Sequence, residues 1–167
     1  MTSKSIPRLG MFAMLATLVL FFHSTRCPAQ IIPTSGPGST YSIPQSQLMQ
    51  ADALNHMLQA KGPNQPLLLH VGSRILFDEA HIPGSVYAGP GSQPAGLQLL
   101  QSTVFKLPKS KLIMLYCGCC PWDRCPNLAP AYQQLHSLGF TNVKVLYLAN
   151  NFGADWVAKG YSVVRTQ

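Results

Sequence analysis

The sequence predicts a single α/β domain in which a central parallel sheet carries helices on both faces. Short apolar runs bounded by turn residues alternate with longer segments whose apolar residues have helical spacing. This alternation is typical of βαβ units. The length of 167 residues fits one domain with an additional targeting segment. A hydrophobic content of 47% provides a core, so the composition excludes a wholly disordered chain.

The first thirty residues have the features of a secretory signal peptide. Lys4 and Arg8 precede an apolar run over 11–22, and Ala29 follows a short polar stretch. The run of 12 residues is shorter than the roughly 20 that a membrane-spanning helix needs. Basic, apolar and small-residue regions in this order predict a cleaved signal peptide over 1–29. We therefore expect an exported protein, periplasmic or secreted, without a stable membrane anchor after cleavage; a retained anchor is the alternative.

Residues 30–45 are rich in Pro, Gly, Ser and Thr, which predicts a flexible linker ahead of a folded domain over 46–167. Cleavage after Ala29 removes three basic residues and no acidic residue, so the net charge falls from +7 to +4. The remaining charge forms no basic run. This argues against nucleic acid as the main partner.

The first half of the domain is predicted to contain a helix, a strand and a second helix. A serine can cap a helix over 46–60, which a Lys-Gly-Pro sequence ends. The apolar run 67–71 lies between a proline and a glycine and predicts a buried strand. A turn at 81–84 and a short extended piece at 85–88 follow. The leucines and valine of 94–107 share one side of a predicted helix.

The second half begins with the clearest buried strand, LIMLY at 112–116, which leads into a cysteine-rich loop. A helix is predicted over 127–138, where a glycine ends it. The apolar run 143–148 predicts another strand, and 154–159 a last short helix. Strands separated by helices in this way favour a largely parallel sheet.

All cysteines that remain after signal cleavage lie in the loop behind the 112–116 strand. They are Cys117, Cys119, Cys120 and Cys125. Ligands of open parallel sheets bind at the carboxyl ends of the strands. The amides of the loop and of the next helix favour negative charge there and lower the pKa of a thiol. The placement therefore predicts a nucleophilic thiolate, with Arg124 as a cation for an anionic substrate.

Two other uses of the loop remain open. A Cys119–Cys125 or Cys120–Cys125 disulfide could staple it in an exported protein. The cysteines could also bind a soft metal such as zinc or copper(I). However, their C-x-C-C-x(4)-C spacing lacks the distant second pair that is usual in zinc sites, so we predict no metal site.

Three stretches, in this order along the chain, resemble the rhodanese (sulfurtransferase) domain family. They are LLLHVGSRILFDEAHIPGSV at 67–86, LIMLYC at 112–117 and LYLANNFGADWVAKGYSV at 146–163. The first is similar to the family's strand, arginine and "HIPG" signature, the second to the strand that ends on its catalytic cysteine, and the third to its closing segment. The resemblance implies a rhodanese-like domain over nearly all of the mature chain.

The resemblance also implies an activity. A cysteine would take a sulfane sulfur from a donor such as thiosulfate as a persulfide and pass it to a thiol or cyanide, with no cofactor. Position at the strand end identifies Cys117 as this nucleophile. The family's C-x(4)-R spacing is instead met from Cys119 to Arg124, which makes Cys119 the second choice. The chain thus resembles a variant with an extended, multi-cysteine loop.

The remaining site predictions concern the cysteine loop and three residues outside it. The active-site loop comprises Gly118, Cys119, Cys120, Trp122, Asp123, Arg124 and Cys125. Arg74 and His81 are expected to have structural roles, and His70 to be a core histidine. The expected partners are a small sulfur-containing anion or thiol and, in addition, a protein that accepts sulfur. The alternatives are a thiol redox protein and a non-catalytic binding or metal-carrying module.

Overall fold

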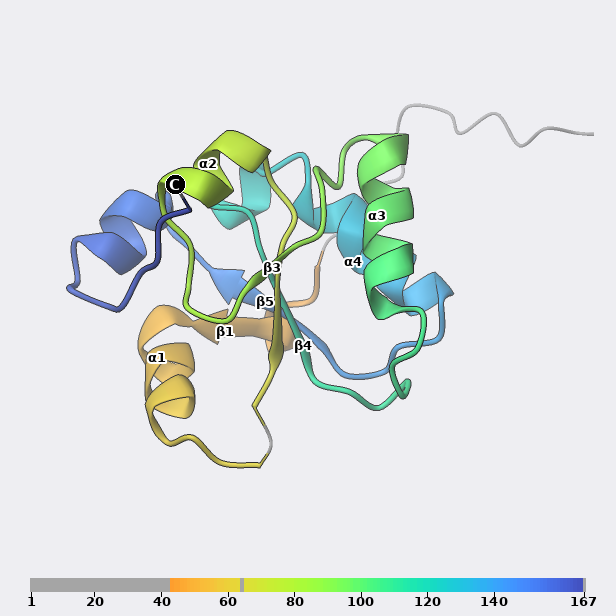
Figure 1. Ribbon diagram of the computed structural model, residues 1–167, viewed down its shortest axis with the longest axis horizontal. Coiled ribbons are helices and arrows are strands. Elements are labelled where there is room, and N and C mark those ends of the chain that lie inside the picture. Colours follow the sequence, from red (N-terminus) through yellow and green to blue (C-terminus); the bar gives the residue numbers. More distant parts are fainter. Residues whose placement is uncertain (1–42, 64, 167) are drawn as a thin grey trace, which may run out of the picture. The chain divides into compact units, whose positions relative to one another are not determined.

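Five parallel strands form the centre of the computed structural model, which describes residues 43–63 and 65–166 (Figure 1). Their spatial order is β1-β5-β4-β2-β3, and every pairing is parallel. The strands are β1 (Leu48–Gln50), β2 (Leu67–His70), β3 (Val86–Tyr87), β4 (Ile113–Tyr116) and β5 (Val143–Tyr147). The predicted α/β class and the strands predicted at 67–71, 112–116 and 143–148 are confirmed.

Helices connect the strands. They are α1 (Ala51–Gln59), α2 (Arg74–Glu79), α3 (Pro94–Val104) and α4 (Leu128–Ser137), with 3-10 turns η1 (Gln45–Gln47) and η2 (Trp122–Arg124) and a π-helical turn η3 (Gly153–Val157). None of them, within the described part of the chain, has both the length and the apolar character to cross a membrane. The predicted signal peptide over 1–29 and most of the linker lie outside the described residues.

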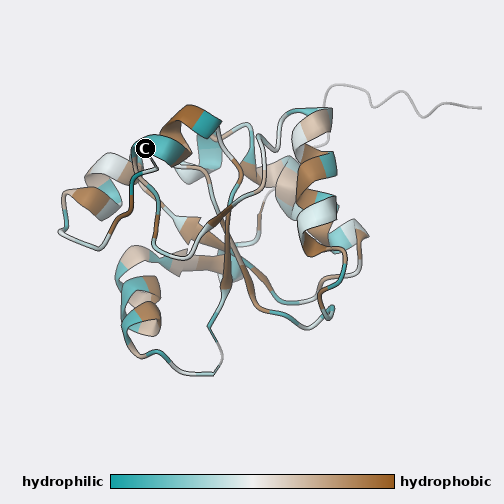
Figure 2. Cartoon of the chain, in the orientation of Figure 1, coloured by the Kyte–Doolittle hydropathy of each residue, from teal (hydrophilic) through white to brown (hydrophobic). Residues whose placement is uncertain are grey.

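Each face of the sheet packs against a different set of helices, because successive side chains of a strand point to opposite faces. Leu69 and Leu115 join the core on the side of α3 and α4. Leu68 and Met114 pack on the other side with α1 and the buried Trp156 of η3. Figure 1 shows α1 and the α3–α4 pair on opposite sides, and Figure 2 shows the strands mostly in the hydrophobic colour. The predicted helices on both faces are therefore confirmed.

The predicted start of the first helix is wrong. The helix expected over 46–60 begins at Ala51, and Leu48–Gln50 form β1 along the edge of β5. Leu48 packs on one core cluster and Met49 on the other, which is the alternation of a strand and not of a helix. Backbone pairing with β5 thus outweighs the helical pattern of this segment.

A short helix that we did not predict, α2, follows β2. Ser73 caps it, since its hydroxyl oxygen accepts a hydrogen bond from the amide of Leu76 at 3.3 Å. Phe77 is the buried residue of α2 and contacts the rings of His70 and Tyr87. The helix therefore lies close to the carboxyl ends of β2 and β3, where the functional site is found.

Candidate active site

Cys117 is the residue that follows β4 in the sequence, and it lies at the carboxyl edge of the sheet. All four residues of β4 are buried, and Cys117 itself is only 1% exposed. Its Sγ accepts a hydrogen bond from Asn127 Nδ2 at 3.3 Å and lies 3.4 Å from Cys119 Sγ. The predicted nucleophile is thus surrounded by hydrogen-bond donors although it is shielded from water.

These donors favour the ionised form of Cys117. The hydrogen bond from the Cys125 thiol, together with those from the Cys119 amide and Asn127, outweighs burial and lowers the pKa of Cys117 to about 6. Burial and the contacts with Cys120 and Cys117 raise the pKa of Cys119 to about 12. The hydrogen bond to Cys117 also raises the pKa of Cys125. At neutral pH Cys117 is therefore the thiolate of this group, and Cys119 and Cys125 are thiols.

Asn127 is a part of this site that the sequence did not indicate. It precedes α4 and is buried. Its Oδ1 accepts hydrogen bonds from the amide and the hydroxyl of Ser92, at 3.0 and 2.8 Å. The Ser92 donors fix the oxygen end of the amide, so Nδ2 is directed at the sulfur of Cys117.

Gly118 allows the chain to bend between Cys117 and Cys119. Its φ of +94° is in a region that residues with a side chain rarely adopt, and an added Cβ would lie 3.0 Å from Phe152 Cβ. The Gly118 carbonyl accepts a hydrogen bond from the Phe152 amide at 3.0 Å. A glycine between the two cysteines thus brings both sulfurs together and connects the loop to the start of η3.

A cavity of about 440 Å³ opens beside Cys117. The predicted site residues that line it are Cys117, Gly118 and Cys119. Leu76, Phe152 and Val157 form apolar parts of its wall, and His70, Glu79 and Asn151 form polar parts. Among the described lining residues, Glu79 is the one carboxylate, and none is a lysine or an arginine. The cavity therefore has room for a small molecule but offers no cation to bind an anion.

The rest of the predicted loop residues do not line the cavity. Trp122, Asp123 and Arg124 form η2, where Asp123 and Arg124 are exposed. Cys125 is buried in the core on the α4 side, and the half-buried Cys120 packs against the same core. The loop is therefore divided into a part that faces the cavity and a part that packs on the domain.

His70 is a cavity residue that sequence reasoning assigned to the core alone. It is the last residue of β2 and only 2% exposed, and its Nδ1 accepts a hydrogen bond from the Gly72 amide at 3.3 Å. Burial lowers its pKa to about 4, so the ring is neutral at pH 7. A Cβ added at Gly72 would lie 2.9 Å from both Cys117 Sγ and His70 Cε1. The missing side chain at Gly72 thus allows the thiol and the imidazole to approach each other.

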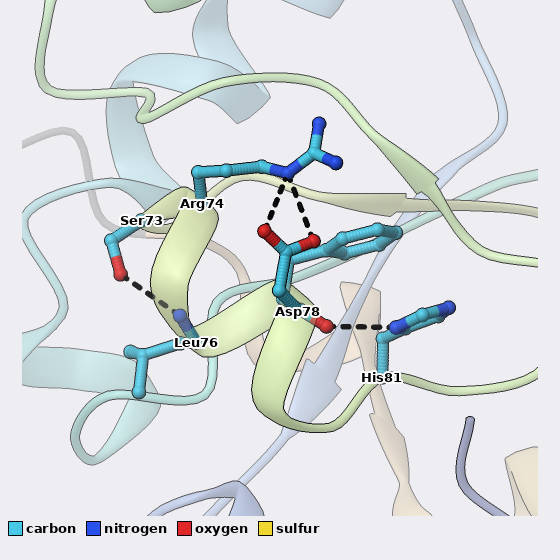
Figure 3. Close-up of polar contacts among 6 residues, drawn as sticks. Ser73, Arg74, Leu76, Asp78 and His81 are labelled. Atoms are coloured by element: carbon cyan, nitrogen blue, oxygen red, sulfur yellow. Dashed lines mark hydrogen bonds and ion pairs between the residues drawn. The ribbon is translucent and has the colours of Figure 1, made fainter. Parts of the chain in front are cut away.

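Arg74 and His81 make contacts within and just behind α2 (Figure 3). Arg74 Nε lies 2.9 Å from both carboxylate oxygens of Asp78, and its guanidinium lies over the Tyr87 ring. His81 Nδ1 is 2.7 Å from the Phe77 carbonyl oxygen, and the His81 backbone pairs with Val164. Neither side chain lines the cavity, and both sets of contacts hold α2 and the following turn in place.

The sulfur positions bear on the metal and disulfide alternatives. The Sγ atoms of Cys117, Cys119 and Cys125 all lie within 4.8 Å of one another, close enough to share a soft metal ion such as copper(I). The sulfur of Cys119 lies 3.4 Å from that of Cys117 and 2.9 Å from that of Cys120. Neither disulfide considered from the sequence is formed, because Cys119, Cys120 and Cys125 are free thiols, although the sulfurs of Cys119 and Cys125 lie within 4.8 Å of each other.

Comparison with known proteins identifies the fold. No protein-family model and no curated protein matches the sequence. Among solved structures, the BH2092 protein from Bacillus halodurans is 23% identical with a TM-score of 0.57, covering 72% of this chain and 78% of that one. The rhodanese-like domain of the Alr3790 protein from Anabaena sp. is 22% identical, with a TM-score of 0.53 and coverage of 71% and 79%.

A third similar structure is the single-domain sulfurtransferase RDL2 from Saccharomyces cerevisiae. It is 17% identical, with a TM-score of 0.52, and the match covers 72% of this chain and 94% of that one. The strand-end cysteine, the parallel sheet and these matches agree with the resemblance seen in the sequence. The chain therefore has the fold of a rhodanese-like domain, with a cluster of four cysteines in the loop after β4.

Proposed function

We propose that this protein is a sulfurtransferase that carries a sulfane sulfur as a persulfide on Cys117. The observation that supports this most directly is the position of Cys117 at a strand end beside a small cavity, where hydrogen bonds from its neighbours lower its pKa. A thiolate is the nucleophilic form of cysteine. The rhodanese-like fold, which the sulfurtransferase RDL2 shares, supports the same reaction class.

The reaction proceeds by two displacements at sulfur. The Cys117 thiolate attacks the outer sulfur of a donor such as thiosulfate, the sulfur–sulfur bond of the donor breaks, and sulfite leaves with the electron pair. An acceptor thiolate or cyanide then attacks the outer sulfur of the persulfide, and Cys117 leaves as a thiolate. A thiol of low pKa is a good leaving group in such exchanges, so the environment of Cys117 favours the second step as well as the first.

The surroundings of Cys117 determine which molecules reach it. Because its side chain is buried, a substrate approaches through the cavity, whose volume of about 440 Å³ suits a small sulfur compound. Glu79 repels an anion there, whereas Arg124 is exposed on η2 and lies outside the cavity. We therefore propose that uncharged sulfane-sulfur donors and thiol acceptors are used better than thiosulfate.

Intact-mass spectrometry after incubation with thiosulfate, in the absence of reductant, tests the proposal. Cys119→Ser, in which the neighbouring thiol cannot remove the added sulfur, is expected to gain about 32 Da, one sulfur atom, and to lose it with dithiothreitol. The wild type is measured beside it. Cys117→Ser should show neither mass gain nor sulfur transfer to cyanide. Full transfer activity in Cys117→Ser would refute the assignment of the nucleophile.

A thiol redox protein is the second candidate, favoured by the 3.4 Å between the sulfurs of Cys117 and Cys119. It predicts a disulfide in the resting protein and no added mass with thiosulfate in any variant.

We also propose, from the signal-peptide features of residues 1–29, that the protein is exported. N-terminal sequencing of the protein recovered from the periplasm or the medium tests this, and an uncleaved cytoplasmic product would refute it.

A further inference from the structure

We propose that Cys119 resolves the Cys117 persulfide by attacking its inner sulfur, which forms a Cys117–Cys119 disulfide and releases the outer sulfur as hydrogen sulfide. The inference rests on the proposed function and adds an activity to it, the reduction of sulfane sulfur to sulfide. The final reductant is an external dithiol.

The two sulfurs lie close to each other. Cys117 Sγ and Cys119 Sγ are 3.4 Å apart, and a disulfide bond is about 2.05 Å long, so a shift of roughly 1.4 Å forms the bond. A reacting group held in contact has an effective concentration far above that of a dissolved thiol. This proximity offsets the raised pKa of the Cys119 thiol, so Cys119 competes with an external acceptor for the persulfide.

Cys119 is also easier to reach from solvent than Cys117. Cys117 is 1% exposed, whereas Cys119 lines the same cavity and is exposed to solvent. A bulky reductant, such as a protein dithiol, reaches a Cys117–Cys119 disulfide at the sulfur of Cys119. Attack there expels Cys117, whose low pKa makes it the better leaving group of the two. The geometry thus favours reduction of the disulfide by attack at Cys119, with Cys117 as the leaving group.

The other two cysteines do not fit this role. Cys125 contacts Cys117 but is 6% exposed, packs in the core and does not line the cavity. A Cys117–Cys125 disulfide would therefore be shielded from an external dithiol. Cys120 contacts Cys119 at 2.9 Å and does not line the cavity. Its substitution by serine removes another thiol of the same loop but keeps both sulfurs of the Cys117–Cys119 pair, so it is compared with the wild type by the number of sulfide molecules released per chain and not by rate.

The resolving step conserves atoms and electrons. The Cys119 thiol and the Cys117 persulfide give one disulfide and one molecule of hydrogen sulfide. The bond between the two persulfide sulfurs breaks and the Cys117–Cys119 bond forms, while the proton of Cys119 goes to the departing sulfur. The sulfane sulfur gains two electrons and the two cysteine sulfurs lose two. The external dithiol then restores both thiols and becomes a disulfide itself.

A single-turnover experiment on the full chain tests the inference. Fully reduced protein, freed of reductant under anaerobic conditions, is mixed with thiosulfate, and both sulfide and intact mass are measured. We expect the wild type and Cys120→Ser to release one sulfide per chain and to lose about 2 Da, the two hydrogens of a new disulfide. Cys119→Ser should release no sulfide and keep about 32 Da on Cys117. Tandem mass spectrometry should locate the wild-type disulfide between Cys117 and Cys119.

The outcomes distinguish the two proposals. A wild type that keeps the added sulfur and releases no sulfide overturns the role of Cys119 but leaves sulfur transfer intact. Sulfide release from Cys119→Ser at the wild-type rate overturns that role as well. If no variant gains mass and none releases sulfide, either with thiosulfate or with an uncharged organic trisulfide as the donor, the sulfurtransferase proposal itself fails. Because Cys119 is exposed, its substitution should leave the fold unchanged, which circular dichroism checks.

Discussion

Substitution of Asn127 by alanine should raise the pKa of Cys117 and slow its reactions at acidic pH. Asn127 Nδ2 donates a hydrogen bond to Cys117 Sγ at 3.3 Å, and this donor stabilises the thiolate more than the thiol. A hydrogen bond to a charged group contributes about 1.5–3 kcal/mol. At about 1.4 kcal/mol per unit, its loss raises the pKa by about 1 to 2 units. The pKa of Cys117 should thus move from about 6 toward the range of about 7 to 8.

The rate of alkylation by iodoacetamide measures this change. At pH 6 half of the wild-type Cys117 is ionised, compared with roughly 1–10% in the variant, so the variant should react about 5 to 50 times more slowly. At pH 9 the two rates should nearly coincide. Ser92→Ala is the matched control, because it removes one of the two Ser92 donors to Asn127 Oδ1 but leaves Nδ2 in place. An unchanged reaction midpoint in a folded Asn127→Ala protein would refute the argument.

Three further predictions concern charge, backbone and stability. Glu79→Gln should raise kcat/KM for thiosulfate roughly threefold to tenfold, because it removes a negative charge from the cavity; an equal rise with an uncharged donor would contradict this. Gly118→Ala should lower the free energy of unfolding by about 1–3 kcal/mol in urea because of its positive φ, whereas Gly62→Ala, with open space around it, serves as control. An ionised Cys117 stabilises the folded state above its unfolded pKa of 9.0, and this contribution is lost as the pH falls toward 6. The free energy of unfolding of the wild type relative to Cys117→Ser should therefore increase from pH 6 to 9, and a flat difference would argue against a thiolate.

The sequence predicted the parts of the fold that depend on local pattern. The runs at 67–71 and 112–116 are apolar throughout and bounded by turn residues, as expected for strands covered on both faces. Leu48–Gln50 has no such local signal, because three residues are compatible with the helix that follows them. Its strand character comes from pairing with β5, almost a hundred residues later in the chain.

The site also contains residues that the local sequence indicates and residues that only tertiary contacts reveal. Cys117 could be placed from the strand that directly precedes it. Cys119 lies beside Cys117 because the chain bends at Gly118. His70 reaches the cavity because β2 pairs with β4 in a register that sets His70 beside Tyr116. Aligning the ends of the two predicted strands would have revealed it. Asn127 is identified by its side-chain hydrogen bonds, which no sequence spacing indicates.

The unequal ionisation of the cluster also determines how it withstands oxidative damage. Peroxides oxidise thiolates in preference to thiols, and a small peroxide reaches Cys117, which has the lowered pKa, through the cavity. A sulfenic acid formed there lies within reach of the Cys119 thiol, which can condense with it to a disulfide and release water. A dithiol reverses that disulfide, whereas the sulfonic acid at the end of the oxidation series is permanent. The short distance between the two sulfurs thus keeps the nucleophile in a form that can be repaired.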